Sequence, residues 1–197
     1  MRVTRLVSVI LLCGLYCVSS RAASPDGVYR KKLHQITVIQ GYSCDKGYAW
    51  FYADGKLNEC WVSQETQYGE ALIPRGSVIF LKPDGRPQIA MLEHSTEIAG
   101  VKCSGGNWLL GPSEGAMTSF YPSGKLRACS LAADQVVQGV PCRHDDGPVA
   151  ILYGLWVKHQ DYDLGVGFYE SGKLKSCGLS EDFGGQKKNT LWKSAAR

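Results

Sequence analysis

The residues best suited to acid–base chemistry lie in one short segment near the C-terminus. His159, Asp161 and Asp163 fall within five residues, and Trp156 precedes them. An imidazole beside two carboxylates is a set of groups that a hydrolase uses to move protons. The same carboxylates are too few for a calcium loop, which needs more oxygen ligands and a glycine at a defined position. We interpret the segment as a solvated loop and expect no metal ion and no cofactor.

The remaining candidates for chemistry lack the spacing that catalysis requires. The other histidines lie far apart, and the only other cluster of acids with an imidazole is His144 followed by Asp145 and Asp146. Neither Ser104 nor Ser113 stands in the G-x-S-x-G frame of a nucleophile elbow. No phosphate-binding loop or dinucleotide fingerprint is present. The sequence therefore predicts a non-enzymatic protein, and the alternative is a secreted carbohydrate-binding protein or hydrolase that uses Asp161, Asp163 and His159.

The first 22 residues have the pattern of a secretory signal peptide. A basic start precedes an apolar stretch from Leu6 to Val18, and small residues follow it. That stretch is shorter than the roughly 20 residues of a membrane-spanning helix. A lipid anchor is disfavoured because neither Cys13 nor Cys17 follows a small residue. We expect an exported protein, periplasmic or extracellular, with no transmembrane segment.

Removal of the predicted signal peptide changes the net charge of the protein. The whole chain carries +4, but removing residues 1–22 takes away three arginines and no acid, which leaves 19 Lys and Arg against 18 Asp and Glu. A net charge of +1 gives no reason to expect nucleic acid as a partner. The remaining basic cluster, residues 187–197, is predicted to be a solvated C-terminal tail that follows a single domain at 23–186.

The dominant feature of that domain is an internal repeat. The pattern F-Y-x-x-G-K-L-x-x-C occurs at residues 51–60, 120–129 and 168–177. A fourth copy at 81–90 keeps the glycine and a cation but loses the aromatic pair and the cysteine. Repeats of this length indicate that one supersecondary unit is stacked on copies of itself.

Each copy follows a shorter motif, an apolar residue and then x-G-x-x-C. This leader motif occurs at 39–44, 98–103 and 137–142, and for the degenerate copy it is aligned on Gly69, at 67–72 without cysteine. Four units therefore begin near residues 39, 67, 98 and 137. The segment between leader motif and hairpin grows from unit to unit, and such insertions often cluster on one face of an array.

The centre of the longer motif predicts a β-hairpin. A type I turn followed by a left-handed residue requires glycine there, which assigns this structural role to Gly55, Gly85, Gly124 and Gly172. Phe120 then faces Leu126 across the ladder, so the Phe and Leu positions form the core face. We expect the aromatic residues to pack rather than to stack on bases or sugars. The predicted fold is all-β, about four antiparallel hairpin repeats in an extended or curled, disulfide-stapled sheet.

Six cysteines remain after export, an even number that favours disulfides. Spacing alone allows fifteen pairings. The degenerate unit has Leu72 and Ala90 where the others have cysteines, so it has lost both partners of one bridge together. This loss favours bridges inside each unit over bridges between units. The pairs are Cys44–Cys60, Cys103–Cys129 and Cys142–Cys177.

The F-Y-x-x-G-K-L core resembles the MORN-repeat-variant family, which consists of short β-hairpin repeats in many bacterial proteins. The resemblance covers four stretches of about ten residues. It implies stacked hairpins used for contacts with a protein or membrane surface, and it brings no catalytic residue. We accordingly expect an interaction or scaffold module whose partner is a protein or a component of the envelope surface.

Overall fold

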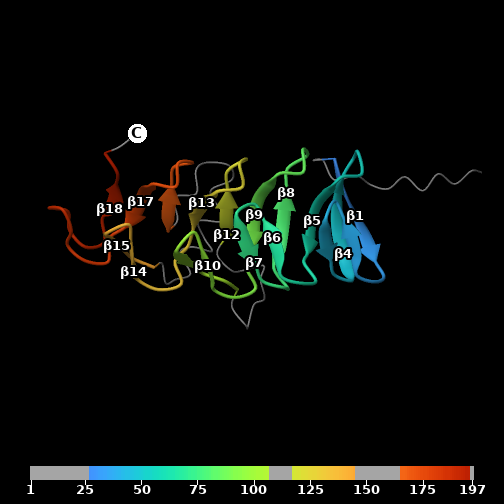
Figure 1. Cartoon of the computed structure of the whole chain (residues 1–197), viewed down its shortest axis with the longest axis horizontal. Coiled ribbons are helices and arrows are strands. Elements are labelled where there is room, and N and C mark those ends of the chain that lie inside the picture. Colours follow the sequence, from blue (N-terminus) through green and yellow to red (C-terminus); the bar gives the residue numbers. More distant parts are fainter. Residues whose placement is uncertain (1–26, 107–116, 145–164, 196–197) are drawn as a thin grey trace, which may run out of the picture.

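The computed structural model describes residues 27–106, 117–144 and 165–195. These ranges contain strands and turns and no helix. The strands follow one another along the long axis of the molecule (Figure 1). The predicted signal peptide lies outside the described residues. No described segment is an apolar helix of the length that crosses a bilayer.

One antiparallel sheet of ten strands runs through the whole array. Its spatial order, β1-β4-β5-β8-β9-β12-β13-β16-β17-β18, follows the order of the chain. At one end of the sheet, tight turns join every second pair of successive strands. The strands are β1 (Val28–Leu33), β4 (Gly47–Tyr52), β5 (Leu57–Trp61), β8 (Val78–Leu81), β9 (Pro87–Met91), β12 (Met117–Phe120), β13 (Leu126–Cys129), β16 (Val166–Phe168), β17 (Leu174–Gly178) and β18 (Leu191–Lys193).

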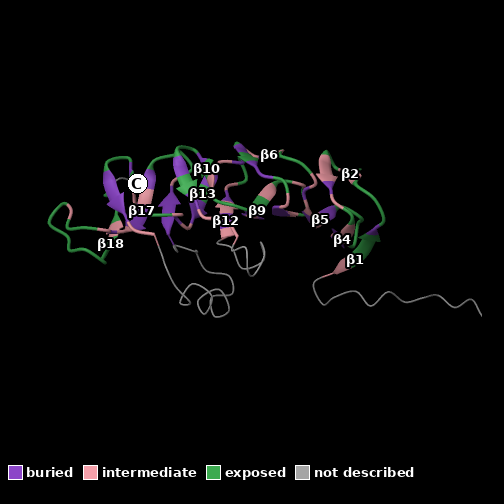
Figure 2. Cartoon of the chain, turned by 90° about the horizontal axis from the view of Figure 1, so that it is seen from below, coloured by how far each residue is buried: buried purple, intermediate pink, exposed green. Residues whose placement is uncertain are grey.

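Four of the connections at the other end of the sheet contain a small hairpin. These small hairpins fold back over one side of the sheet, which we call the near face (Figure 2). Each is a separate two-stranded sheet. They are β2 (Thr37–Ile39) with β3 (Tyr42–Cys44), β6 (Thr66–Tyr68) with β7 (Ala71–Ile73), β10 (Thr96–Ile98) with β11 (Val101–Cys103), and β14 (Gln135–Val137) with β15 (Val140–Cys142). The repeat is therefore a meander whose alternate connections are themselves hairpins.

All four long hairpins turn in the same way. In the first, the N–H of Tyr52 donates to the carbonyl of Lys56 at 2.8 Å, and the N–H of Gly55 donates to the carbonyl of Tyr52. Gly55 has a φ of +86°, and its three counterparts lie between +82° and +85°. A Cβ in this left-handed conformation is unfavourable, which explains why glycine survives even in the degenerate unit.

The core lies between the near face and the small hairpins. Phe51 pairs with Leu57 across the ladder, and the equivalent pairs recur in the third and fourth units. These six side chains are buried. A second periodic set was not singled out in the sequence: one buried aliphatic residue precedes each small hairpin or the C-terminal loop. This set is Leu33, Val62, Leu92, Leu131 and Leu179.

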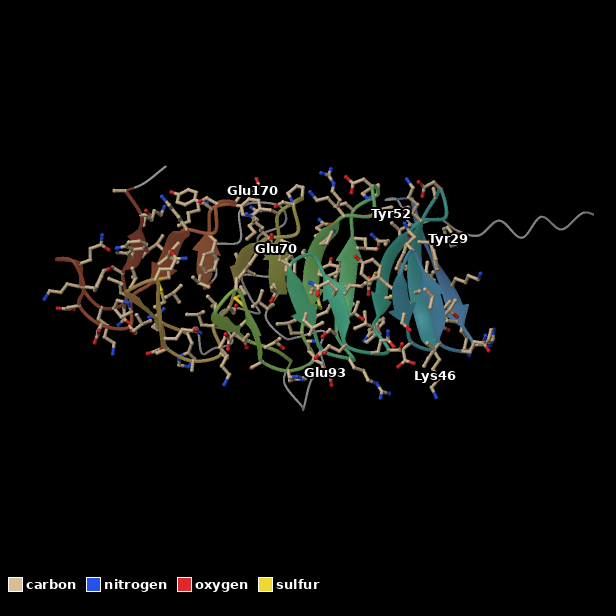
Figure 3. All side chains as sticks on the ribbon, viewed as in Figure 1. Tyr29, Lys46, Tyr52, Glu70, Glu93 and Glu170 are labelled. Atoms are coloured by element: carbon tan, nitrogen blue, oxygen red, sulfur yellow. A yellow bond between two sulfur atoms is a disulfide. The ribbon has the colours of Figure 1, made fainter. Side chains whose placement is uncertain are left out.

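The tyrosine of the motif joins one unit to the next. The hydroxyl of Tyr52 donates to the carbonyl of Leu81 at 2.6 Å, and that of Tyr121 donates to the carbonyl of Phe168 at 2.8 Å. Figure 3 places Tyr52 at the turn end of the sheet, close to Tyr29. In the degenerate unit, Lys82 stands at this position. The packing role expected for the tyrosine is therefore accompanied by a hydrogen bond between units.

Tyr121→Phe is expected to lower the free energy of unfolding by about 1 kcal/mol, because the ring stays and one hydrogen bond between units is lost. Urea denaturation measures the change. Tyr169→Phe is the matched control, since Tyr169 holds the same motif position in the last unit. Equal losses for the two variants would contradict a role between units.

Disulfides tie each small hairpin to the long hairpin of its own unit. The pairs are Cys44–Cys60, Cys103–Cys129 and Cys142–Cys177, with Cα–Cα distances of 5.6–5.7 Å. Each bridge crosses the core from the end of a short strand to the second strand of the long hairpin. Three bridges in one small domain are typical of an oxidising, non-cytoplasmic environment.

The unit without a bridge departs from the alignment expected from the sequence. Thr66 pairs with Ile73 as Thr37 pairs with Cys44, so Ile73 and not Leu72 holds the cysteine position. The reason lies in the turn. Gly69, with φ +63°, is the first of its two turn residues, whereas the glycine is the second in the other small hairpins. Ile73 is fully buried and Leu72 is 49% exposed.

The C-terminal residues also differ from the prediction of a tail. β18 pairs with β17 and matches Trp192 with Cys177. Trp192 packs against the core cluster, while Lys187 forms an ion pair with Asp182 at 2.8 Å. The basic residues of 187–197 misled the prediction because they flank Leu191 and Trp192, which extend the sheet.

Candidate binding face

The side of the long sheet turned away from the small hairpins, which we call the far face, carries bulky apolar side chains in its N-terminal half. The cross-strand register places them next to one another: Trp61 opposes Val78, Val78 opposes Met91, and Met91 opposes Met117. In the next row, Phe80 opposes Ile89. The full set is Trp50, Trp61, Val78, Phe80, Ile89, Met91 and Met117.

These residues are neither core nor ordinary surface. All except Val78 are partly exposed. In the described ranges, the four small hairpins all lie over the near face, and no described strand covers this side. Contiguous apolar surface of this kind is uncommon on a folded domain and marks sites of contact with other molecules.

The same face changes character toward the C-terminus. Continuing along the row from Ile89, the register passes through Ser119, Ala128, Gly167 and Ser176. Small side chains replace the aromatic and aliphatic ones within one further strand. The bulky apolar side chains of the far face are thus confined to β4, β5, β8, β9 and the start of β12.

One carboxylate lies within the apolar half. Glu59 is the only Asp or Glu in the ten strands of the long sheet. Trp50 opposes it on β4 and Phe80 opposes it on β8. Trp61, two residues further along β5, lies on the same face, and its ring centroid is 5.7 Å from that of Trp50. The carboxylate is therefore surrounded by aromatic groups.

The charge of Glu59 is not compensated within the part of the chain that the structure describes. The side chain has no hydrogen bond or ion pair there, and burial raises its pKa to about 7. In its row, the nearest cation is Arg30, which is separated from it by Trp50. The Arg30 guanidinium instead lies 4.3 Å from the ring centroid of Tyr48. Half-buried, uncompensated carboxylates of this kind are found at functional sites.

Glu59→Gln is expected to raise the free energy of unfolding by about 1 kcal/mol at pH 8 and by much less at pH 4. The folded protein holds the proton of Glu59 up to a pKa of about 7, against an ordinary value of 4.5, so stability falls as the pH rises through that window. The figure of about 1 kcal/mol allows for solvent screening of a partly exposed group. Urea titrations at both pH values measure it.

Glu97→Gln serves as the control, because Glu97 is an exposed acid on a small hairpin. It should change stability little at either pH. A Glu59→Gln variant whose stability gain is the same at pH 4 and pH 8 would contradict the interpretation.

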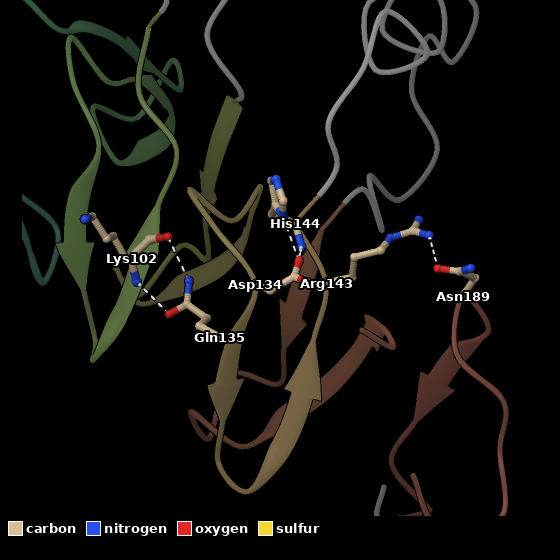
Figure 4. Close-up of polar contacts among 6 residues, drawn as sticks. All are labelled: Lys102, Asp134, Gln135, Arg143, His144 and Asn189. Atoms are coloured by element: carbon tan, nitrogen blue, oxygen red, sulfur yellow. Dashed lines mark hydrogen bonds and ion pairs between the residues drawn. The ribbon is translucent and has the colours of Figure 1, made fainter. Parts of the chain in front are cut away.

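A separate polar cluster joins the third and fourth small hairpins to the C-terminal loop (Figure 4). The Gln135 amide bonds both backbone groups of Lys102, at 3.1 and 3.0 Å. His144 Nδ1 lies 2.6 Å from Asp134 Oδ1, and its hydrogen bonds lower the pKa of that carboxyl. Arg143 donates to Asn189 at 2.7 Å. The Lys102 and Arg143 contacts join neighbouring parts of the array, and the His144–Asp134 contact closes the base of the fourth small hairpin, so this cluster has a structural role.

Four residues were proposed from the sequence for hydrolase chemistry. Asp161, Asp163, His159 and Trp156 lie outside the described residues. His144 is bonded to Asp134, which the sequence reading did not pair with it. Among the described residues, no group of three or more His, Cys, Asp or Glu side chains could hold a metal ion.

Glu59 was missed in the sequence because the motif varies at its position. The third residue after the Leu of each hairpin is Cys, and the residue before that Cys is Glu59, Ala128 or Ser176. The available signal was a carboxylate directly before the buried Cys60. Strict alternation from Leu57 places residue 59 on the core face, but an irregularity in the register of β4 and β5 turns Glu59 to the other face. No protein-family model, curated protein or solved structure matches this chain.

Proposed function

We propose that this protein is an exported, non-enzymatic interaction module that contacts a protein or envelope surface through the apolar half of its far face. The observation that carries the proposal is the contiguous patch around Trp50, Trp61 and Phe80. It is built on a rigid, disulfide-stapled sheet, which limits the entropy lost when a partner binds. The signal-peptide pattern of residues 1–22 and the three disulfides support a periplasmic or extracellular location.

The repeat itself supports the same class of function. Its F-Y-x-x-G-K-L core resembles the MORN-repeat-variant signature, which implies stacked hairpins used for contacts with proteins or membrane surfaces. Tryptophan, methionine and phenylalanine are also enriched in the centres of protein interfaces. Since these residue types are concentrated on one side of the sheet, a partner that covers that side would bury them together.

A carbohydrate-binding protein is the second candidate, because tryptophan rings can stack on a sugar and a neighbouring carboxylate can accept hydrogen bonds from its hydroxyl groups. The rings of Trp50 and Trp61 are inclined at 41° to each other, so they do not form one flat platform. Glycoside hydrolysis commonly uses two carboxylates. Glu59 is the only one in the strands of this sheet. These features favour a protein partner.

The test uses the mature protein immobilised and exposed to envelope extract or culture medium of its source, with retained proteins identified by mass spectrometry. Trp50→Ser with Trp61→Ser should abolish retention of the specific partners. The control is Val38→Ser with Val136→Ser, since these side chains are 71% and 70% exposed on the small hairpins. Partners lost with the control but kept with the tryptophan variant would contradict the proposal, and binding only to glycans on an array would favour the second candidate.

A further inference from the structure

We propose that the far face binds a protein segment that places one lysine or arginine side chain against Glu59, between apolar residues. This inference rests on the proposed function and specifies the chemistry of the partner. Its basis is the juxtaposition of Trp50, Glu59 and Phe80 on adjacent strands, with Trp61 beside them. A carboxylate in an aromatic setting is a site for a cation, because ring faces and the carboxylate attract it together.

The counter-ion is missing from the described chain itself. Across β4, the position beyond Trp50 is occupied by Arg30, which is directed onto the ring of Tyr48. Across β8, the positions beyond Phe80 are Ile89 and Ser119, both uncharged. Along β5 itself, Glu59 lies between Asn58 and Cys60, and Cys60 is in a disulfide. A cation supplied from outside would neutralise the one acidic group of the sheet.

Other charged residues of the far face indicate which groups should lie near that cation in the partner. Arg30 and Lys32 lie at the β1 edge of the same face. These two cations repel a generally basic partner, and they favour an acidic group of the partner near the β1 edge. Arg30 and Glu59 are two strands apart, about 10 Å at the usual spacing of strands. The matching segment has one cation among apolar residues and an acidic group about 10 Å away, and it is not a basic tract.

The experiment selects binders from a phage-displayed library of random dodecapeptides on the immobilised mature protein. Selected sequences should be enriched in a single Lys or Arg flanked by apolar residues. Selection on Glu59→Gln should lose that enrichment, and selection on Glu97→Gln should keep it. Glu97 is an acid on the opposite side of the molecule, so it controls for overall charge.

A double-mutant cycle with the strongest peptide completes the test. Replacing its cation by methionine should weaken binding at least tenfold to the wild type, measured by calorimetry, and by less than threefold to Glu59→Gln. Equal losses on both backgrounds, or the absence of any cation-bearing binder, would overturn the inference. Peptides that need Trp50 and Trp61 but carry no cation would leave the proposed function standing and refute only the charge pairing.

Self-association is distinguished in the same samples by sedimentation. A second copy could offer Arg30 or Lys32 to Glu59, so it is the competing occupant. A monomer at all concentrations is the expected result. A dimer that forms with rising concentration and is lost in Glu59→Gln would overturn the inference in favour of pairing between copies.

Discussion

Replacing both Cys142 and Cys177 by alanine is expected to lower the free energy of unfolding by about 4 kcal/mol. This disulfide closes the longest loop of the three, with a sequence separation of 35. In the chain-entropy treatment, the stabilisation increases with the logarithm of the loop length. Urea denaturation of the folded variant and of the wild type, both under oxidising conditions, measures the difference.

The matched control is the double alanine variant of Cys44 and Cys60, whose separation is 16. Its expected loss is smaller, about 3 kcal/mol. Both bridges are fully or almost fully buried, so each variant also leaves a small cavity of similar kind. A larger loss for the short loop than for the long one would show that packing rather than loop closure determines the contribution of these bridges.

The second large effect runs in the opposite direction. Ile73→Cys with Ala90→Cys is expected to form a fourth disulfide and to raise the free energy of unfolding by as much as about 3 kcal/mol. Ile73 stands where Cys44 does in the repeat, and Ala90 stands where Cys60 does; both are fully buried. Non-reducing mass mapping identifies the bridge, and thermal unfolding measures the gain.

Leu72→Cys with Ala90→Cys is the control for that experiment. Leu72 lies on the opposite side of the short strand and is 49% exposed. It should leave two free thiols, because a one-residue shift in a strand turns the side chain to the other face. A bridge formed equally well by both variants would contradict the register of the second small hairpin.

The repeat made most of the fold predictable. Glycine in the turn and alternating apolar residues determine a hairpin locally, and copies of the hairpin must bury their apolar faces against each other. The order of the strands follows, because each strand of the long sheet pairs with the strands of that sheet that precede and follow it in the chain. The loss of both cysteines from one unit also indicated how the others pair.

The separate small hairpins were less accessible from the sequence. Each is only three residues per strand, and short strands carry little periodic signal. The shift at Gly69 shows the limit: the same glycine serves either turn position, so aligning glycines misplaced the register by one residue. The strand at Leu191–Lys193 was hidden for a similar reason, since a two-residue apolar signal between lysines is weak.

The candidate site was the least predictable part. Whether Glu59 faces solvent or aromatic neighbours depends in part on β8, a strand outside its own hairpin that approaches it only in the sheet. Pattern alone assigned Trp50 and Trp61 to packing, and they do pack against each other. What pattern could not show is that they do so on the side without small hairpins.

Charged residues at both ends of the sheet oppose the joining of one molecule to the next. A sheet with open edges can accept a further molecule as its next strand, which is how filaments grow. Here the outermost strand at one end carries Arg30, Lys31 and Lys32, and the outermost strand at the other ends in Lys193. Joining one molecule's first strand to another's last would bring cations together, which disfavours growth into a fibre.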